Sequence, residues 1–478
     1  MSRPITLQAA RAPHRFCSGS ILRHTLTMAG TGTLGLLAIF IVDLLNFFYI
    51  SRLHDASLTA AIAFIGAVNY LQMSVSIGMS IGLGAIVSRR IGARRMDEAR
   101  RIASSSLVVM VAVMLVIGLA TVLALGPVLS GLGAHGAVHA AAARNLRIIS
   151  PFVPLIALGM GCSSLLRSVG DARRSMTVTL WSAALVAGLD PVLIFLLHLG
   201  LFGAAISTVL SRALAAGLGL LAVSRHHILG RPDWRHLGTD VRPVVSVALP
   251  AILTNLATPA GSAFVTHAQA RFGLEAVSGS ATIDRIVPVA FAFIFALTGS
   301  LGPIMGQNLG AAQIGRVRQT LYCALALVLG CVLAMWALLA SLQDPLIRLF
   351  AAHGSAATLM HLFCSWVVAS FLFVGALFVA NTAFNNLGAP LLSTAFNWGR
   401  ATLGTVPFVL AGERYGPSGV MIGQAAGGVL FGTLAVIAAF LLLRRLKASD
   451  TPQGTGEAPA LTVPGPGGKA AMAEIAEG

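Results

Sequence analysis

Charged side chains are scarce in this sequence. Asp, Glu, Lys and Arg together make up 10% of its 478 residues, whereas 56% are hydrophobic. Soluble domains carry about 25% charged residues, so this composition excludes a soluble globular protein. The apolar runs are continuous rather than alternating, which excludes a transmembrane β-barrel. The composition therefore predicts an all-α polytopic membrane protein.

Cysteine is also sparse, and its spacing is not typical of a metal site or a disulfide framework. The five cysteines form no CxxC pair, and four of them lie in apolar runs, where Cys packs as a small hydrophobe. His198, His267 and His361 lie in different apolar runs, and His226, His227 and His236 lie in one loop without a metal-ligand pattern. No phosphate-binding GxxxxGK[ST] sequence is present. We therefore expect no cofactor, no metal site, no catalytic residues and no ATP-driven step.

Acidic residues are the rarer of the two charged classes. The sequence has 16 Asp and Glu against 32 Lys and Arg, for a net charge of +16. If the apolar runs span a membrane, 23 basic residues lie on one set of loops and tails, including 89–101 and 225–242. Six lie on the opposite loops, and three, Arg212, Arg285 and Arg400, lie within spans. This positive-inside pattern predicts a multi-pass protein of a bacterial inner membrane, with both termini cytoplasmic and no nucleic-acid partner.

Twelve apolar runs are each long enough for the ~20 residues that a bilayer requires. They lie near 25–50, 57–88, 102–127, 146–166, 176–198, 202–224, 243–270, 276–306, 319–342, 357–382, 391–411 and 418–443. The predicted organisation is a basic cytoplasmic N-terminal tail (1–24), an N-terminal six-helix lobe (25–224), a cytoplasmic inter-lobe loop (225–242), a C-terminal six-helix lobe (243–446) and a disordered C-terminal tail (447–478).

An internal repeat relates the two halves. GAIVSRRIGARRMDEARR at 84–101 matches GPIMGQNLGAAQIGRVRQ at 302–319, so that Gly84 pairs with Gly302 and Gly92 with Gly310, 218 residues apart. Because six spans are an even number, the two copies have the same orientation and are related by an axis along the membrane normal. Two such lobes around a cleft form the architecture of an alternating-access transporter.

These motifs together resemble the multidrug and toxic compound extrusion (MATE) family. The resemblance rests on the two Gly–Ala–basic loops just described, on LLRSVGDARRSM after the fourth span and on LDPVLIF in the fifth, and it covers nearly the whole chain. The acids of the first lobe are most similar to those of the bacterial DinF-like branch. The resemblance implies a V-shaped bundle of twelve transmembrane helices in two parallel six-helix repeats.

The candidate coupling residues are acids and an amide within spans. Asp43 and Asn46 are three residues apart on one helix face, and a charged Asp at mid-membrane costs ~2.5–3.5 kcal/mol even on the mildest scale. Asp190 matches an acid of the family. We expect Asp43, Asn46 and Asp190 to bind the coupling cation, either a proton or Na⁺. Asp284 and Arg285 form a possible substrate or second-lobe site.

Two departures from the family pattern bear on the coupling ion. Asn46 stands where that branch usually carries its first-span Asp, and Asp43 lies one turn earlier. The usual Asn four residues before Asp190 is replaced by Val186, which removes an oxygen ligand that a hard cation would use. We therefore favour protons over Na⁺. Asp43 and Asp190 are expected to face one another across the first lobe and to titrate as a pair.

The leading functional hypothesis is a secondary active efflux transporter. It would act as a monomer and export small organic compounds, cationic or amphipathic, in exchange for a cation. The nearest rival is a flippase for lipid-linked oligosaccharides or polysaccharides, which clustered arginines in the cleft would favour. A membrane enzyme is a hypothesis of a different class, and it would need a nucleophile–base pair or a metal cluster at membrane depth.

Overall fold

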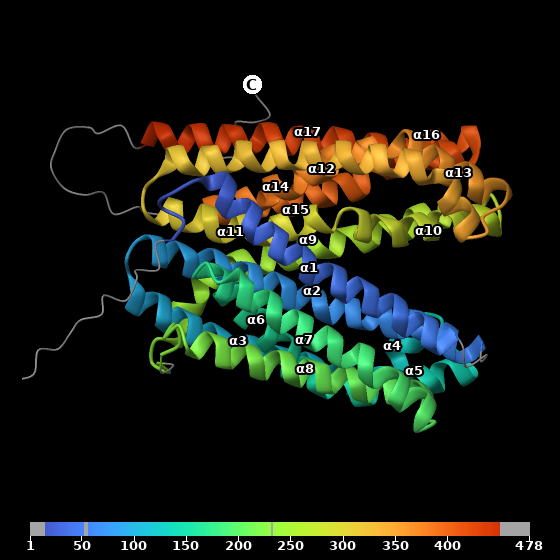
Figure 1. Ribbon diagram of the computed structural model, residues 1–478, viewed down its shortest axis with the longest axis horizontal. Helices are drawn as coiled ribbons and strands as arrows, with labels where there is room; N and C mark the ends of the chain where they lie inside the picture. Colours follow the sequence, from blue (N-terminus) through green and yellow to red (C-terminus); the bar gives the residue numbers. More distant parts are fainter. Residues whose placement is uncertain (1–14, 52–55, 231–232, 450–478) are drawn as a thin grey trace, which may run out of the picture.

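The computed structural model describes residues 15–51, 56–230 and 233–449, and these are helical with short connections (Figure 1). The first half contains α1 (Ile21–Ser51), α2 (Ala56–Gly92), α3 (Met96–Leu123), α4 (Leu125–Gly131), α5 (Gly136–Ile149), η1 (Ser150–Phe152), α6 (Val153–Ser168), α7 (Ala172–Pro191), η2 (Val192–Leu196) and α8 (Gly200–Ser224). The second contains α9 (Leu237–Ala270), α10 (Leu274–Ala290), α11 (Ala292–Gly310), α12 (Ile314–Leu349), α13 (Gly354–Ser365), η3 (Val367–Ser370), α14 (Phe371–Leu387), α15 (Pro390–Gly399), η4 (Arg400–Gly404), α16 (Val406–Gly412), η5 (Glu413–Tyr415) and α17 (Gly416–Ser449).

The described residues make twelve passes, as predicted. Ten segments are long and apolar enough to span a membrane, and α10 with α11 forms a further span that is bent by 50°. One of the ten, Pro390–Leu446, contains two passes, because the chain reverses at Gly416, where φ is +77°. A residue with a β-carbon rarely adopts this φ. After the reversal α17 packs back along α16.

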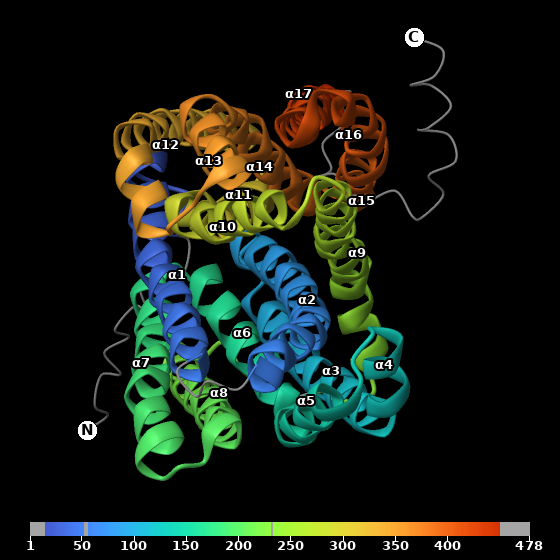
Figure 2. The ribbon, with the colours of Figure 1, turned by 90° about the vertical axis from the view of Figure 1, so that its right-hand side faces the viewer.

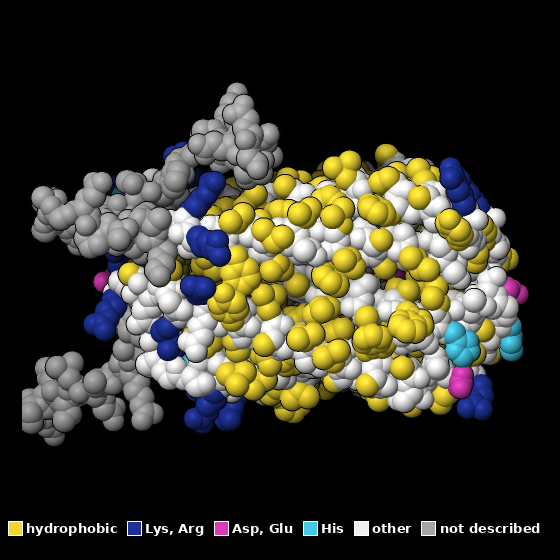
Figure 3. Space-filling model, turned by 90° about the horizontal axis from the view of Figure 1, so that it is seen from above, with side chains coloured by type: hydrophobic (Ala, Val, Ile, Leu, Met, Phe, Trp, Pro, Cys, Tyr) yellow, Lys and Arg dark blue, Asp and Glu magenta, His cyan; other side chains and the backbone are white. Residues whose placement is uncertain are grey.

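A broad apolar band covers the face of the bundle drawn in Figure 3, and charged side chains gather at the two ends of this face. One end carries the α2–α3 turn at 93–95, the segment before α9 and the α11–α12 turn at 311–313, and with them most of the Arg residues. We call it the basic end. An apolar surface between two charged ends is the pattern expected of a protein in a bilayer.

The helices form two lobes, each with its own hydrophobic core (Figures 1 and 2). Helices α1 and α9 lie at the junction, because α1 packs against α7 and α11, and α9 packs against α2 and α15. Both helices begin earlier than predicted, at Ile21 and Leu237. The start of α9 is held on the first lobe, where the Asp240 carboxylate accepts a bond of 2.8 Å from the Arg101 guanidinium. Residues 1–14 and 450–478 of the predicted tails lie outside the described residues.

The two repeats cross one another at the basic end. A β-carbon on Gly92 would collide with the backbone carbonyl of Gln307, and one on Gly310 would collide with that of Arg89. These two contacts are reciprocal. Gln307 is the counterpart of Arg89 in the repeat, and Gly310 is the counterpart of Gly92, because each pair is 218 residues apart. The pseudo-twofold axis of the repeat therefore passes through the crossing of α2 and α11, and the glycines permit the close backbone approach.

Candidate functional site

A cavity of about 950 Å³ lies between the two lobes. Its wall comes from α1, α2, α6, α7 and α8 on one side and from α9, α10, α11, α13, η3, α14, α15, η4 and α17 on the other. This volume is within the range of sites that enclose a drug-sized molecule. Because both repeats build the cavity, it changes shape whenever one lobe moves against the other.

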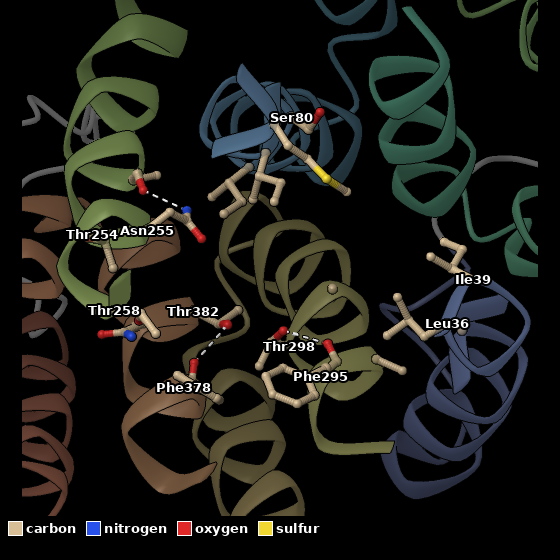
Figure 4. A pocket seen from close by; sticks show the side chains of 18 of the residues that line it. Leu36, Ile39, Ser80, Thr254, Asn255, Thr258, Phe295, Thr298, Phe378 and Thr382 are labelled. Atoms are coloured by element: carbon tan, nitrogen blue, oxygen red, sulfur yellow. Dashed lines mark hydrogen bonds between the residues drawn. The ribbon is translucent and has the colours of Figure 1, made fainter. Parts of the chain in front are cut away.

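The cavity wall is mostly apolar, with polar groups on particular helices (Figure 4). Leu36 and Ile39 of α1 face the cavity as an apolar wall. Hydroxyl and amide groups come from α9, where the Asn255 amide donates to the Ala251 carbonyl at 2.8 Å. Phe295 of α11 and Phe378 of α14 lie with ring centroids 5.6 Å apart. Such a surface combines apolar contact area with a few hydrogen-bonding groups that can orient a ligand.

Four charged side chains are among the described lining residues, and three of them are arginines. Arg167 donates to the Ser175 hydroxyl at 3.3 Å. Arg212 has only long bonds, of 3.4 Å to the Ile149 carbonyl and 3.5 Å to the Asn69 amide oxygen. The two other charged residues, Arg400 and Asp284, come from the second lobe. Of the predicted pair Asp284 and Arg285, only Asp284 lines the cavity.

Asp190 is buried in the first lobe, beside the cavity rather than on its wall. Its side chain is 1% exposed and accepts a hydrogen bond from the Ser207 hydroxyl of α8. Pro191 follows directly, and the helix continues as the π-helical turn η2. A proline in a helix removes a backbone donor and leaves a carbonyl of the preceding turn unpaired. Asp190 therefore lies where the regular backbone bonding of α7 is interrupted.

Asp43 and Asn46 lie near the depth of Asp190 on a neighbouring helix. α1 and α7 both start at the basic end, and a β-carbon built on Gly35 would lie 3.5 Å from Thr179. The same number of residues separates Gly35 from Asn46 on α1 as separates Thr179 from Asp190 on α7, so Asn46 and Asp190 lie at a similar depth. Among the described residues, however, no hydrogen bond or ion pair joins Asp43 or Asn46 to another side chain, and Asp43 is exposed. The predicted pairing of Asp43 with Asp190 stays a prediction.

The segment 15–20 bridges the two lobes at the basic end, where Phe16 packs against the cavity-lining residues Met28 and Ala172. Phe16 is 1% exposed, and its backbone is bonded on both sides: its N–H donates to the Gln307 side chain at 3.2 Å, and its carbonyl accepts from Arg316 at 2.8 Å. Arg15 donates to the Gly170 carbonyl of the first lobe at 3.2 Å. Residues assigned from the sequence to a basic tail therefore tie one lobe to the other.

The second lobe also holds a buried amide network that sequence reasoning did not identify. Asn397 of α15 donates to the Asn381 side chain of α14 at 3.0 Å, and the Ser393 hydroxyl bonds the Asn385 amide oxygen at 3.2 Å. Asn381, Asn385 and Asn397 line the cavity. The signal was present in the polar run ANTAFNNLG within an apolar segment, where buried amides must find partners.

Two membrane-spanning repeats around a shared cavity define a secondary transporter. The chain belongs to the MatE family, whose model matches residues 33–192 and 250–410. It is similar to the crystal structure of the Vibrio cholerae MATE transporter VcmN in the bent form, with a TM-score of 0.84 and 25% identity over 90% of this chain and 98% of that one.

Two relatives extend the comparison. This chain is 27% identical to a protein of Shewanella oneidensis named "FAD transporter", over 91% of this chain and 96% of the relative. It is 23% identical to the multidrug export protein MepA of Staphylococcus aureus, over 60% of this chain and 64% of MepA. The MATE resemblance found in the sequence is thus confirmed, whereas the DinF-like branch stays a prediction.

Proposed function

We propose that this protein exports small organic compounds across a bacterial inner membrane, as a monomer, by alternating access coupled to an inward flow of cations. The observation that carries the proposal is the cavity built by both repeats, whose lobes are joined at the basic end by the crossing of α2 with α11 and by residues 15–20. The names of the relatives, for FAD transport and for multidrug export, support substrates of this size class.

The basic end is assigned to the cytoplasm. Loops rich in Arg remain on the cytoplasmic side during insertion, and both described ends of the chain lie at the basic end. With this orientation the present state is the one closed to the cytoplasm. Release of substrate outside and binding of the coupling cation belong to this state, and opening at the basic end would admit the next substrate.

The coupling cation is assigned to Asp43, Asn46 and Asp190, with protons favoured over Na⁺. Asp190 accepts from the Ser207 hydroxyl, and Val186 on the preceding turn offers no side-chain oxygen. A sodium ion requires several oxygen ligands, whereas a proton needs one carboxylate. Coupling follows if the cation binds the two states with different affinity.

Inverted membrane vesicles test both parts of this proposal. Uptake of ethidium and of flavin mononucleotide would be measured with a pH gradient and a Na⁺ gradient imposed separately. We expect uptake under the pH gradient alone, and we expect Asp43→Asn and Asp190→Asn each to abolish it, with the double variant no worse. Uptake that requires Na⁺ would overturn the choice of protons. Full activity of Asp43→Asn would overturn the site, and no uptake of any organic probe under either gradient would overturn export.

A further inference from the structure

The cavity carries more positive than negative charge. Its charged lining residues in the described chain are Arg167, Arg212, Arg400 and Asp284. Arg212 belongs to α8 of the first lobe and Arg400 to η4 of the second, so positive groups line both sides of the cavity. An arginine stays protonated in proteins, which fixes this excess at any physiological pH.

None of the three arginines is paired with a carboxylate of the described chain. Arg167 and Arg212 bond only neutral oxygens, and the Nε atom of Arg400 is buried without a hydrogen-bond partner. By contrast, arginines elsewhere find acids, as Arg271 does with Glu413 at 2.9 Å. The three arginines are half-buried, and a charge that is partly withdrawn from water without a counter-charge is costly. At membrane depth such residues mark substrate or ion pathways.

The rest of the wall is suited to an aromatic or apolar organic body. Phe295, Phe371 and Phe378 form an aromatic group on the second lobe, with the first two ring centroids 6.4 Å apart. Leu36 and Ile39 supply the facing apolar wall, and the Asn and Thr groups of α9 and α14 can orient polar substituents (Figure 4). Aromatic pairs of this kind accept a further ring at their faces or edges.

We propose that, within the export function above, the cavity selects organic anions. The substrate class is an aromatic or otherwise apolar compound that bears a phosphate or a carboxylate. Arg212 and Arg400 bind the anionic group from opposite lobes, and the aromatic group of α11 and α14 binds the body. A guanidinium offers two parallel N–H donors to such an anion, and binding the anion supplies the counter-charge that the protein itself lacks at these arginines.

Flavin mononucleotide and riboflavin provide a matched pair of probes, because they share one ring system and differ by a phosphate. Binding to the purified full-length protein in nanodiscs of neutral lipid would be measured by flavin fluorescence. We expect the mononucleotide to bind at least tenfold more tightly than riboflavin. Arg212→Gln and Arg400→Gln should each weaken binding of the mononucleotide about tenfold and leave riboflavin unchanged. Arg348→Gln, at an exposed arginine outside the cavity, should change neither.

Two further experiments test misfolding and a lipid ligand. Arg400→Lys retains the charge without the planar donors, so it should keep part of the preference for the mononucleotide. A partial preference in this variant would show that the loss in Arg400→Gln does not result from misfolding. Repetition in nanodiscs containing phosphatidylglycerol tests a lipid headgroup as the source of the anion. If phosphatidylglycerol weakens binding of the mononucleotide, and if this competition disappears in Arg212→Gln and Arg400→Gln, the result supports the anion site with a lipid as its ligand.

The inference and the export function can fail separately. If the protein binds riboflavin or ethidium as tightly as the mononucleotide, the anion inference is overturned. If vesicles then still accumulate ethidium under a pH gradient, the export function stands. Transport of the mononucleotide that is insensitive to both Arg→Gln variants would also overturn the assignment of the anion to these arginines.

Discussion

Phe16 offers a direct test of how the basic end is closed. Its ring is 1% exposed and packs in a small cluster with Met28, Ala172 and Ile304, which come from both lobes. The Phe16→Ala substitution removes the ring but keeps the two backbone bonds. It should therefore release the segment 15–20 from the junction without altering the helices that form the lobes.

The expected size of the effect follows from the burial of the ring. Truncating a fully buried Phe to Ala costs about 3–5 kcal/mol. We take about 3 kcal/mol and assign the whole loss to the docked state of the segment. The equilibrium constant for undocking then rises on the order of 100-fold, because 1.4 kcal/mol corresponds to a factor of ten. Leu22→Ala, at a residue that is 48% exposed on the first turn of α1, serves as the matched control.

Cys17 reports on this equilibrium. Its thiol lies 3.6 Å from the Gln307 carbonyl, and burial raises the pKa of Cys17, so docking lowers the fraction of reactive thiolate at neutral pH. In a background with the other four cysteines replaced by Ala, maleimide should modify Cys17 on the order of 100-fold faster in Phe16→Ala than in the parent. Leu22→Ala should change the rate less than twofold. Equal rates in Phe16→Ala and the parent would refute the reasoning that the ring holds the segment closed.

Three further predictions concern the lobes and the acids. Gly310→Ala should also accelerate modification of Cys17, because the added methyl collides with the Arg89 carbonyl and forces α2 and α11 apart at their crossing. An unchanged rate would show that the two helices accommodate the methyl without releasing the segment 15–20. Asp190→Asn should bind organic substrates normally yet lose gradient-driven uptake, whereas Ser207→Ala, which retains the carboxylate, should cost about 1 kcal/mol of stability and keep uptake. Asp284→Asn should increase the affinity for flavin mononucleotide several-fold, measured by fluorescence titration, because it removes the carboxylate that repels an anion in the cavity.

The number of passes could be predicted because each apolar run exceeds the length that a bilayer requires. The bend between α10 and α11 at Phe291 was not predicted, although Pro288 lies three residues before it and a proline within a helical run favours a kink. The start of α9 was also missed. Polar residues around Asp240 resemble a loop, but in the structure they form the first turns of α9 and are held on the first lobe by the bond from Arg101 to Asp240.

The candidate site was predictable only in part. Asp190 and Asp284 stand out because acids are rare in apolar runs, and the structure places one inside the first lobe and the other on the cavity wall. The contact that residues 15–20 make with both lobes has no local signal in the sequence. Its partners, Gln307 and Arg316, lie some 300 residues away in the chain, so neither periodicity nor composition could indicate the contact.

The reciprocal crossing of α2 and α11 has a consequence for the ancestry of the molecule. Gly92 meets residue 307 and Gly310 meets residue 89, which is the geometry of an isologous contact between two copies of one subunit. In an ancestral homodimer of two six-helix subunits, any substitution at this contact would have occurred twice, once on each side of the axis. Joining the copies into one chain removed that restriction. The halves could then diverge, so that Asp190 could arise in one lobe while its counterpart remained free of an acid.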